Sequence, residues 1–167
     1  KTFDLSQTDG KELPTIGPSE LVGNIEGYPK LLQALQEISP VPVSFELIDG
    51  NAKGFYHLED KKIVVQDGMS EVQTIKTLLH EMAHQKLHDK DNVPEAKDIS
   101  RNGKEVEAES VAYVVCQHYG INTSDYSFSY VAGWSEGKET PELKASLETI
   151  RTAASELISE IEGHFAE

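Results

Sequence analysis

Residues 78–84 read LLHEMAH and contain the spacing H-E-x-x-H. In a helix of about 3.6 residues per turn, His80 and His84 lie one turn apart on the same face. Two imidazoles placed in this way can bind one Zn²⁺, and Glu81 beside them can take a proton from a water that the metal activates. The motif therefore predicts a zinc-dependent hydrolytic site, with His80 and His84 as ligands and Glu81 as the catalytic base.

The sequence around the motif favours a helix. Ser70, followed three residues later by Gln73, is a capping-box signature for the start of that helix. An apolar stripe at helical spacing runs through the segment and consists of Val72, Ile75, Leu79 and Met82. The two histidines and Glu81 fall on the adjacent sector of the helical wheel, which we expect to lie outside the core. A surface helix with incidental histidines is the simpler alternative, and this context argues against it.

A tetrahedral catalytic zinc site needs a third protein ligand and one open position. One zinc-protease pattern continues with a glycine and a third histidine, but this chain has Leu87 and Lys90 at those places. His88 lies one turn beyond His84, yet three histidines along a straight helix span about 12 Å and cannot all reach one ion. We therefore expect His88 to be solvated or to support a ligand, and the third ligand to come from another segment.

Residues 104–119 predict a second helix that carries candidate ligands. This helix is apolar over most of its circumference, through Val106, Ala108, Val111, Ala112, Val114, Val115 and Cys116. Glu105 and Glu109 nevertheless stand on one face, and a buried carboxylate is costly unless it is paired or binds a metal. Glu107 points elsewhere, and we expect it to face solvent. From the residues alone, both Glu105 and Glu109 are candidates for the third ligand.

The two motifs together resemble a known arrangement. His80-Glu81-x-x-His84 followed by Glu105-x-x-Ala108-Glu109-x-x-Ala112 is similar to the gluzincin pattern of the ImmA/IrrE-type metallopeptidases and of the zincin domain in ArdC-like and LtrC-like mobile-element proteins. Residues 105–135 look closest to the ArdC-like and LtrC-like group. The resemblance covers about half of the chain. It implies a Zn²⁺ cofactor with Glu105 as the third ligand.

Glu109 stands where the family has Asp or Asn, so the chain departs from the pattern by one side-chain carbon. We expect Glu109 to accept a hydrogen bond from a ring N–H of His80 or His84 and to fix the orientation of that ring.

The remaining segments predict an α+β domain. Residues 1–28 contain Pro14, Pro18 and several glycines and look like an extended lead-in or linker, so the domain itself is expected to span residues 29–167. Residues 29–38 predict a helix, residues 43–48 a strand, and residues 54–58 and 62–66 a hairpin. A long helix starts at residues 140–141, and its apolar side consists of Leu143, Leu147, Ile150, Leu157 and Ile161.

With the resemblance, this layout gives a zincin-like fold. A small, largely antiparallel sheet packs on the H-E-x-x-H helix, with the second ligand helix behind it. We expect the long C-terminal helix to dock on the core, with dimerisation through its apolar side as the alternative. A monomer is favoured.

Composition narrows the class of protein. A length of 167 residues suits one domain with a core, and a net charge of −14 argues against nucleic-acid binding by this domain itself. No apolar run approaches the roughly 18 residues that span a bilayer, and no signal-peptide pattern opens the chain, so we expect a cytoplasmic protein without a membrane partner. The single Cys116 cannot form an internal disulfide and is expected to be a small core residue. The chain begins at Lys1 rather than Met, which favours a fragment of a longer protein.

The leading hypothesis is a zinc metalloendopeptidase that acts on an intracellular protein in a mobile-element, antirestriction or regulatory context. By the resemblance, an extended peptide adds to a sheet edge beside the metal, either residues 54–57 or residues 62–65. Candidates for stabilising the oxyanion are His57, Tyr113, Tyr126 and Tyr130. The alternative hypothesis is a non-catalytic, acidic, zinc-containing module that binds a restriction or regulatory protein.

Overall fold

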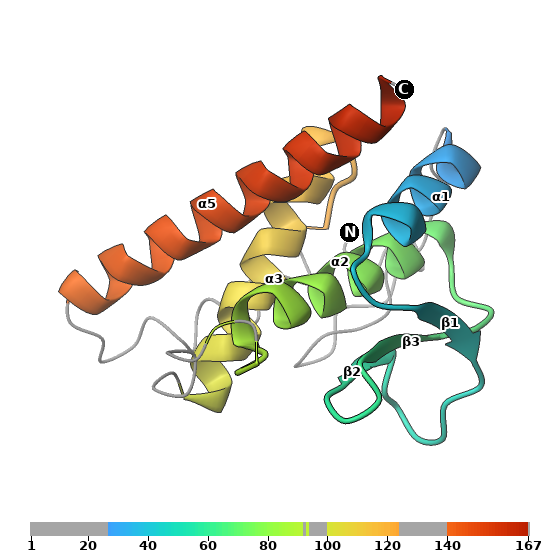
Figure 1. The fold of residues 1–167 in the computed structure, drawn as a ribbon, viewed down its shortest axis with the longest axis horizontal. Coiled ribbons are helices and arrows are strands. Elements are labelled where there is room, and N and C mark those ends of the chain that lie inside the picture. The colour runs from blue at the N-terminus through green and yellow to red at the C-terminus, as the bar shows by residue number, and fades with distance from the viewer. Residues whose placement is uncertain (1–26, 92, 94–99, 124–139, 167) are drawn as a thin grey trace, which may run out of the picture.

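The computed structural model describes residues 27–91, 93, 100–123 and 140–166, with side chains in the last range from residue 145 onward. In these ranges the elements follow in the order α1 (Tyr28–Ile38), β1 (Val43–Glu46), β2 (Gly54–His57), β3 (Lys62–Gln66), α2 (Glu71–His88), α3 (Arg101–His118) and α5 (Thr140–Phe165) (Figure 1). The predicted α+β class is confirmed. The lead-in predicted for residues 1–28 lies almost wholly outside the described residues, as do Tyr126 and Tyr130.

The sheet is mixed, with the strand order β1-β3-β2. The hairpin of β2 and β3 is antiparallel as predicted, but β1 pairs with β3 in parallel, so the expected largely antiparallel sheet is wrong for one of the two pairings. The physical reason is that the connection over residues 47–53 does not place β2 directly beside β1 but leaves room for one strand between them. Strand β3 fills this position, becomes the central strand and runs parallel to β1.

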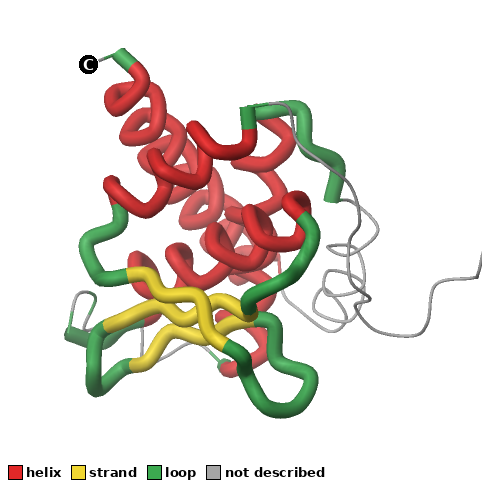
Figure 2. Tube along the Cα trace, turned by 90° about the vertical axis from the view of Figure 1, so that its right-hand side faces the viewer, coloured by secondary structure: helices red, strands yellow, loops and turns green. Residues whose placement is uncertain are grey.

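The register of the sheet decides which side chains face the helices. One row across the three strands contains Val43, Ile63 and Tyr56, and the next row contains Phe45, Val65 and Gly54. The hydrophobic members of both rows belong to the core or pack against it. Because side chains alternate along a strand, the two rows form the sheet face that the helices cover (Figure 2).

Gly54 allows β2 to lie close to α2. A Cβ atom at Gly54 would stand 2.7 Å from Thr77 Cγ2, 3.0 Å from the Val64 carbonyl oxygen and 3.6 Å from Glu81 Cγ. A side chain at this position would therefore push the strand away from the helix that carries the H-E-x-x-H motif.

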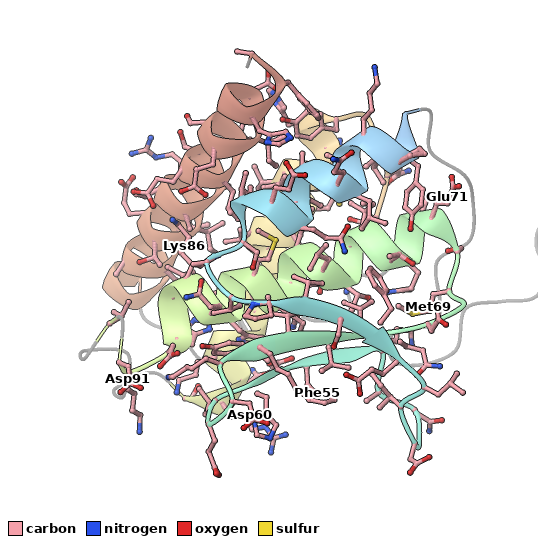
Figure 3. The ribbon with its side chains drawn as sticks, turned by 45° about the vertical axis from the view of Figure 1, so that its right-hand side comes forward. Phe55, Asp60, Met69, Glu71, Lys86 and Asp91 are labelled. Carbon is pink, nitrogen blue, oxygen red and sulfur yellow. The ribbon has the colours of Figure 1, made fainter. Side chains whose placement is uncertain are left out.

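Helix α2 begins at the predicted cap, where the Ser70 side chain accepts a hydrogen bond from the Gln73 N–H at 3.1 Å. It packs against β2, β3, α1, α3 and α5, and it runs along the sheet with α1 above it (Figure 3). Because neighbours surround it, His80 and Glu81 are each only 7% exposed, and the expectation that their sector lies outside the core is wrong. His80 and Glu81 are thus buried, whereas His84 is partly exposed.

Helix α3 packs against both α2 and α5. The Ser100 side chain caps its start, and the buried Ala108 and Ala112 contribute to the core. Helix α5 docks on the core as predicted through Ile150, Leu157 and Ile161. Leu147 is 59% exposed, contrary to the predicted stripe, and the Leu143 side chain lies outside the described residues.

Cys116 is buried and unpaired, and burial raises the pKa of its thiol to about 12, which fits the predicted core role. Among the described residues, none of the helices combines the length and the apolar character that crossing a membrane requires.

Candidate metal centre

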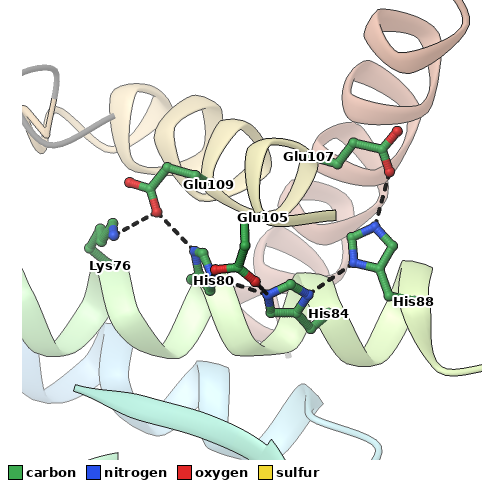
Figure 4. A network of polar contacts seen from close by, with 7 residues as sticks. All are labelled: Lys76, His80, His84, His88, Glu105, Glu107 and Glu109. Atoms are coloured by element: carbon green, nitrogen blue, oxygen red, sulfur yellow. Dashed lines mark hydrogen bonds and ion pairs between the residues drawn. The ribbon is translucent and has the colours of Figure 1, made fainter. Parts of the chain in front are cut away.

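Three ligand atoms from two helices converge on one point. Helix α2 contributes His80 and His84, whose Nε2 atoms lie 3.1 Å apart, and α3 contributes Glu105. Glu105 Oε2 lies 2.7 Å from His84 Nε2, and Oε1 lies 3.4 Å from His80 Nε2 (Figure 4). Within the described residues, these three side chains form the group able to hold a metal ion.

The donor set and spacing fit zinc. Bonds of about 2.0–2.2 Å in tetrahedral geometry place ligand atoms roughly 3.4 Å from one another. The separations here, from 2.7 to 3.4 Å, are close to that value. Two imidazoles and one carboxylate also form a ligand set of catalytic zinc, in which the fourth position is open to water or substrate.

Glu109 lies behind the ligand cluster. It is fully buried, and its Oε1 is 2.8 Å from His80 Nδ1, on the side of the ring away from Nε2. When Nε2 binds a metal ion, the ring proton resides on Nδ1, and this N–H donates a hydrogen bond to Glu109 Oε1. Glu109 therefore makes the contact with a ring nitrogen of His80 that was expected, and Glu105 is the carboxylate among the converging atoms, while the metal roles of both stay predictions.

The prediction from sequence missed Lys76, which pairs with Glu109 at 2.6 Å and is 2% exposed. The only available signal was its spacing of four residues before His80, which puts both on one face of α2. Burial lowers the pKa of Lys76 to about 8, against the opposing effect of Glu109. The pKa of Glu109 lies below its usual value because its contacts with His80 and Lys76 outweigh burial.

The carboxylates of Glu105 and Glu109 favour a positive charge at the position where the three ligand atoms converge. Burial alone would lower the pKa of His80, but its contacts with Glu105 and Glu109 outweigh burial and raise it to about 9. The same contacts with His80 and His84 outweigh the burial of Glu105 and hold its pKa well below the usual range. A cation placed between these groups meets a field that already favours it.

His84 is supported by a different route. Its Nδ1 lies 2.9 Å from His88 Nδ1, and His88 Nε2 lies 3.0 Å from Glu107 Oε1. His88 is 8% exposed, so the first of its two expected roles, a solvated side chain, is wrong. Glu107 is 2% exposed, and the expectation that it faces solvent is wrong, because α5 packs on α3 and Ser146 contacts the Glu107 carboxylate.

Glu81 lies beside the converging atoms in the wall of a cleft of about 540 Å³. The cleft is lined by Gly54, Phe55, Tyr56, Leu58, Glu81, His84, His88, Arg101, Lys104 and Glu105. Burial raises the pKa of Glu81 and outweighs the opposing effects of His80 and His84. A carboxylate with a raised pKa is a better proton acceptor, which suits a general base.

One sheet edge borders this cleft. Strand β3 pairs on both sides, so residues 62–65 are not an edge, whereas β2 pairs with β3 alone among the described strands. His57 does not line the cleft, and its Nδ1 accepts a hydrogen bond from the Asp60 N–H. Tyr113 is also absent from the lining. Tyr56 does line the cleft, but its hydroxyl donates to Asp89 at 2.6 Å.

No family model and no solved structure matches this chain. The uncharacterized protein pXO2-81 of Bacillus anthracis is 32% identical to it over 184 aligned residues, which include 99% of this chain. The chain spans 31% of the length of that protein. This similarity assigns no activity.

Proposed function

We propose that this chain is a zinc metalloendopeptidase domain of the gluzincin type, in which His80, His84 and Glu105 hold Zn²⁺. The observation that carries the proposal is the convergence of His80 Nε2, His84 Nε2 and a Glu105 carboxylate beside a cleft, which His84, Glu105 and the buried Glu81 line. A zincin-like fold and a cytoplasmic location belong to the same proposal.

The residues of the cleft divide the chemistry between them. Zinc, when bound, supplies a Lewis acid that polarises a peptide carbonyl and acidifies water. Glu81 accepts the proton of the attacking water and delivers it to the leaving amine nitrogen. Burial raises the pKa of Glu81, which makes its carboxylate a stronger proton acceptor for the first of these transfers.

The edge of β2 supplies a docking line for an extended peptide. Gly54 and Phe55 line the cleft, and Gly54 lies close to Glu81, so a peptide that pairs with β2 passes beside the base. Main-chain pairing of this kind gives affinity with little dependence on side chains. The proposed substrate is an intracellular protein, in a mobile-element, antirestriction or regulatory context, bound by a monomer.

The test is the substitution Glu81→Gln, which keeps the shape of the side chain and removes its basicity. We expect unchanged zinc content and a loss of peptide hydrolysis of at least about 100-fold, measured on an unstructured protein such as casein. Glu59→Gln, at an exposed position of the hairpin turn, is the matched control and should retain activity. Hydrolysis by Glu81→Gln at the wild-type rate contradicts the proposal.

A second candidate function is a zinc-containing binding module, and the net charge of −14 favours it because an acidic surface suits a basic partner. A structural zinc site fills all four positions with protein ligands. The cluster here offers three among the described residues. Equal antirestriction activity of the wild type and Glu81→Gln would support binding rather than catalysis.

A further inference from the structure

A chain of polar groups leads from His84 away from the converging ligand atoms (Figure 4). His84 Nδ1 lies 2.9 Å from His88 Nδ1, and His88 Nε2 lies 3.0 Å from Glu107 Oε1. On α5, the Ser146 hydroxyl donates to Glu107 Oε2 at 3.0 Å. Each distance is within hydrogen-bond range, and the chain crosses three helices.

The proton positions along this chain follow from the ring chemistry. When His84 directs the lone pair of Nε2 at the ligand cluster, its proton resides on Nδ1, and this N–H donates a hydrogen bond to His88 Nδ1. His88 then carries its proton on Nε2, and this N–H donates a hydrogen bond to Glu107 Oε1. The Glu107 carboxylate only accepts, so it ends the series and accepts a second hydrogen bond, from the Ser146 hydroxyl, at its other oxygen.

Because His88 and Glu107 are buried, the hydrogen bond between them contributes to the stability of the fold. His88 is 8% exposed and Glu107 is 2% exposed, and a buried carboxylate without hydrogen bonds is costly. Glu107 is no candidate ligand, because its carboxylate faces His88 and Ser146 rather than the ligand cluster. The two ligands on α2 are thus held differently, His80 directly by Glu109 and His84 through an interposed imidazole.

We infer that His88 and Glu107 are positioning residues that fix the tautomer and ring orientation of His84, and that Ser146 anchors them to α5. The inference rests on the proposed metal site. Its consequence is that the geometry of one metal ligand depends on how the C-terminal helix docks. A metal-ligating histidine is more basic and better oriented when its second nitrogen donates to such a partner.

Substitutions at position 88 separate positioning from packing. In His88→Gln the amide oxygen can accept from His84 and the amide N–H can donate to Glu107, whereas His88→Leu fills space and does neither. We expect His88→Leu to weaken zinc affinity by about 10- to 100-fold and His88→Gln to stay within about threefold of the wild type. Chelator competition gives the affinity, and the visible absorption of the Co²⁺-loaded protein reports ligand geometry. His118→Leu, at an exposed position of α3, is the control.

Two results overturn the inference. One is a folded His88→Leu protein with wild-type zinc affinity and an unchanged Co²⁺ spectrum. The other is an equal loss in His88→Gln and His88→Leu, which indicates packing alone. If His88→Leu does not fold, Glu107→Leu, which cannot accept from His88, takes its place, with an expected loss of about tenfold, and unchanged affinity overturns the inference.

Zinc affinity also separates this inference from the proposed function. A wild-type protein that binds zinc without cleaving any peptide contradicts the peptidase, while the comparison at position 88 still decides the positioning role. A wild-type protein that binds no zinc overturns both.

Discussion

Two carboxylates on one face of α3 serve the proposed site in different ways. Glu105 reaches the Nε2 atoms of both histidines, whereas Glu109 contacts the far nitrogen of His80. We therefore expect Glu105→Ala to abolish tight zinc binding and Glu109→Ala to weaken it by about 10- to 100-fold. Isothermal titration with zinc measures both. A zinc-loaded structure with a Glu109 oxygen about 2.1 Å from the metal, and with Glu105 turned away, contradicts the assignment.

The buried pair of Lys76 and Glu109 allows a test by stability. Both side chains are at most 2% exposed, so Lys76→Met leaves a buried carboxylate with one partner fewer. We expect the free energy of unfolding to fall by about 3 kcal/mol, because Glu109 keeps its contact with His80 but loses the buried cation that offsets its charge.

The double variant Lys76→Met with Glu109→Leu removes both charges and should recover part of that loss. Urea unfolding of the metal-free proteins, followed by circular dichroism, measures the cycle. Strictly additive losses would show that the two groups do not depend on each other.

At the scale of residues, the sequence predicted the three side chains whose ligand atoms converge. It missed most of the buried polar side chains that contact them. His80, His84 and Glu105 follow from helical spacing together with the resemblance, and they lie together in the structure. Lys76 and Glu107 carry charges that a single helical wheel assigns to solvent. Their burial depends on neighbours far away in the chain, such as α5, which one helix considered alone does not reveal.

At the scale of elements, the contact between β2 and α2 depends on Gly54. In Gly54→Ala, the new methyl group would meet the stiff Thr77 side chain at 2.7 Å and the Val64 carbonyl at 3.0 Å. We expect a loss of about 1–3 kcal/mol in the free energy of unfolding, together with weaker peptide hydrolysis, because β2 must move away from Glu81.

Thr77→Ser is the matched rescue, since it removes the clashing methyl and keeps the hydroxyl that accepts from Gln73. Gly163→Ala is the control in α5, where a Cβ meets nothing within 4 Å, and it should stabilise the helix by about 0.5–1 kcal/mol. Thermal unfolding of the variants measures these changes in stability. Wild-type stability in Gly54→Ala would mean that the strand does not press on the helix.

The elements differ in how well the sequence predicts them. The start of α2 follows from a local cap at Ser70, and the β2–β3 hairpin follows from two short apolar runs around a turn. The position of β1 does not follow, because insertion of β3 between β1 and β2 is a long-range choice. The connection over residues 47–53 is compatible with β2 lying directly beside β1 or one strand position away from it. No local sequence signal distinguishes the two arrangements.

Across the whole molecule, the proposed site sits where separate layers meet. The sheet provides an edge, α2 and α3 provide the converging atoms, and α5 supports the far side of α3. Because Glu105 comes from a different helix than His80 and His84, a bound ion would join α2 to α3. Metal binding and folding are then coupled, since the unfolded chain does not hold the three groups together.

This coupling predicts a thermal shift. At a free zinc concentration about 100 times the dissociation constant, binding adds about 2.7 kcal/mol to the stability of the folded state. For a chain of this size that corresponds to a rise in Tm of roughly 5–11 °C over the chelator-treated protein. Differential scanning fluorimetry of the wild type, with zinc and with chelator, measures the shift.

Two controls identify the site responsible for that shift. Mg²⁺ should leave the Tm unchanged, because it prefers octahedral oxygen ligands to imidazoles. His84→Ala should also show no rise with zinc, because it removes one of the three converging atoms. An equal rise in His84→Ala would place the zinc elsewhere on this acidic chain, and no rise in the wild type would contradict a metal bridge between α2 and α3.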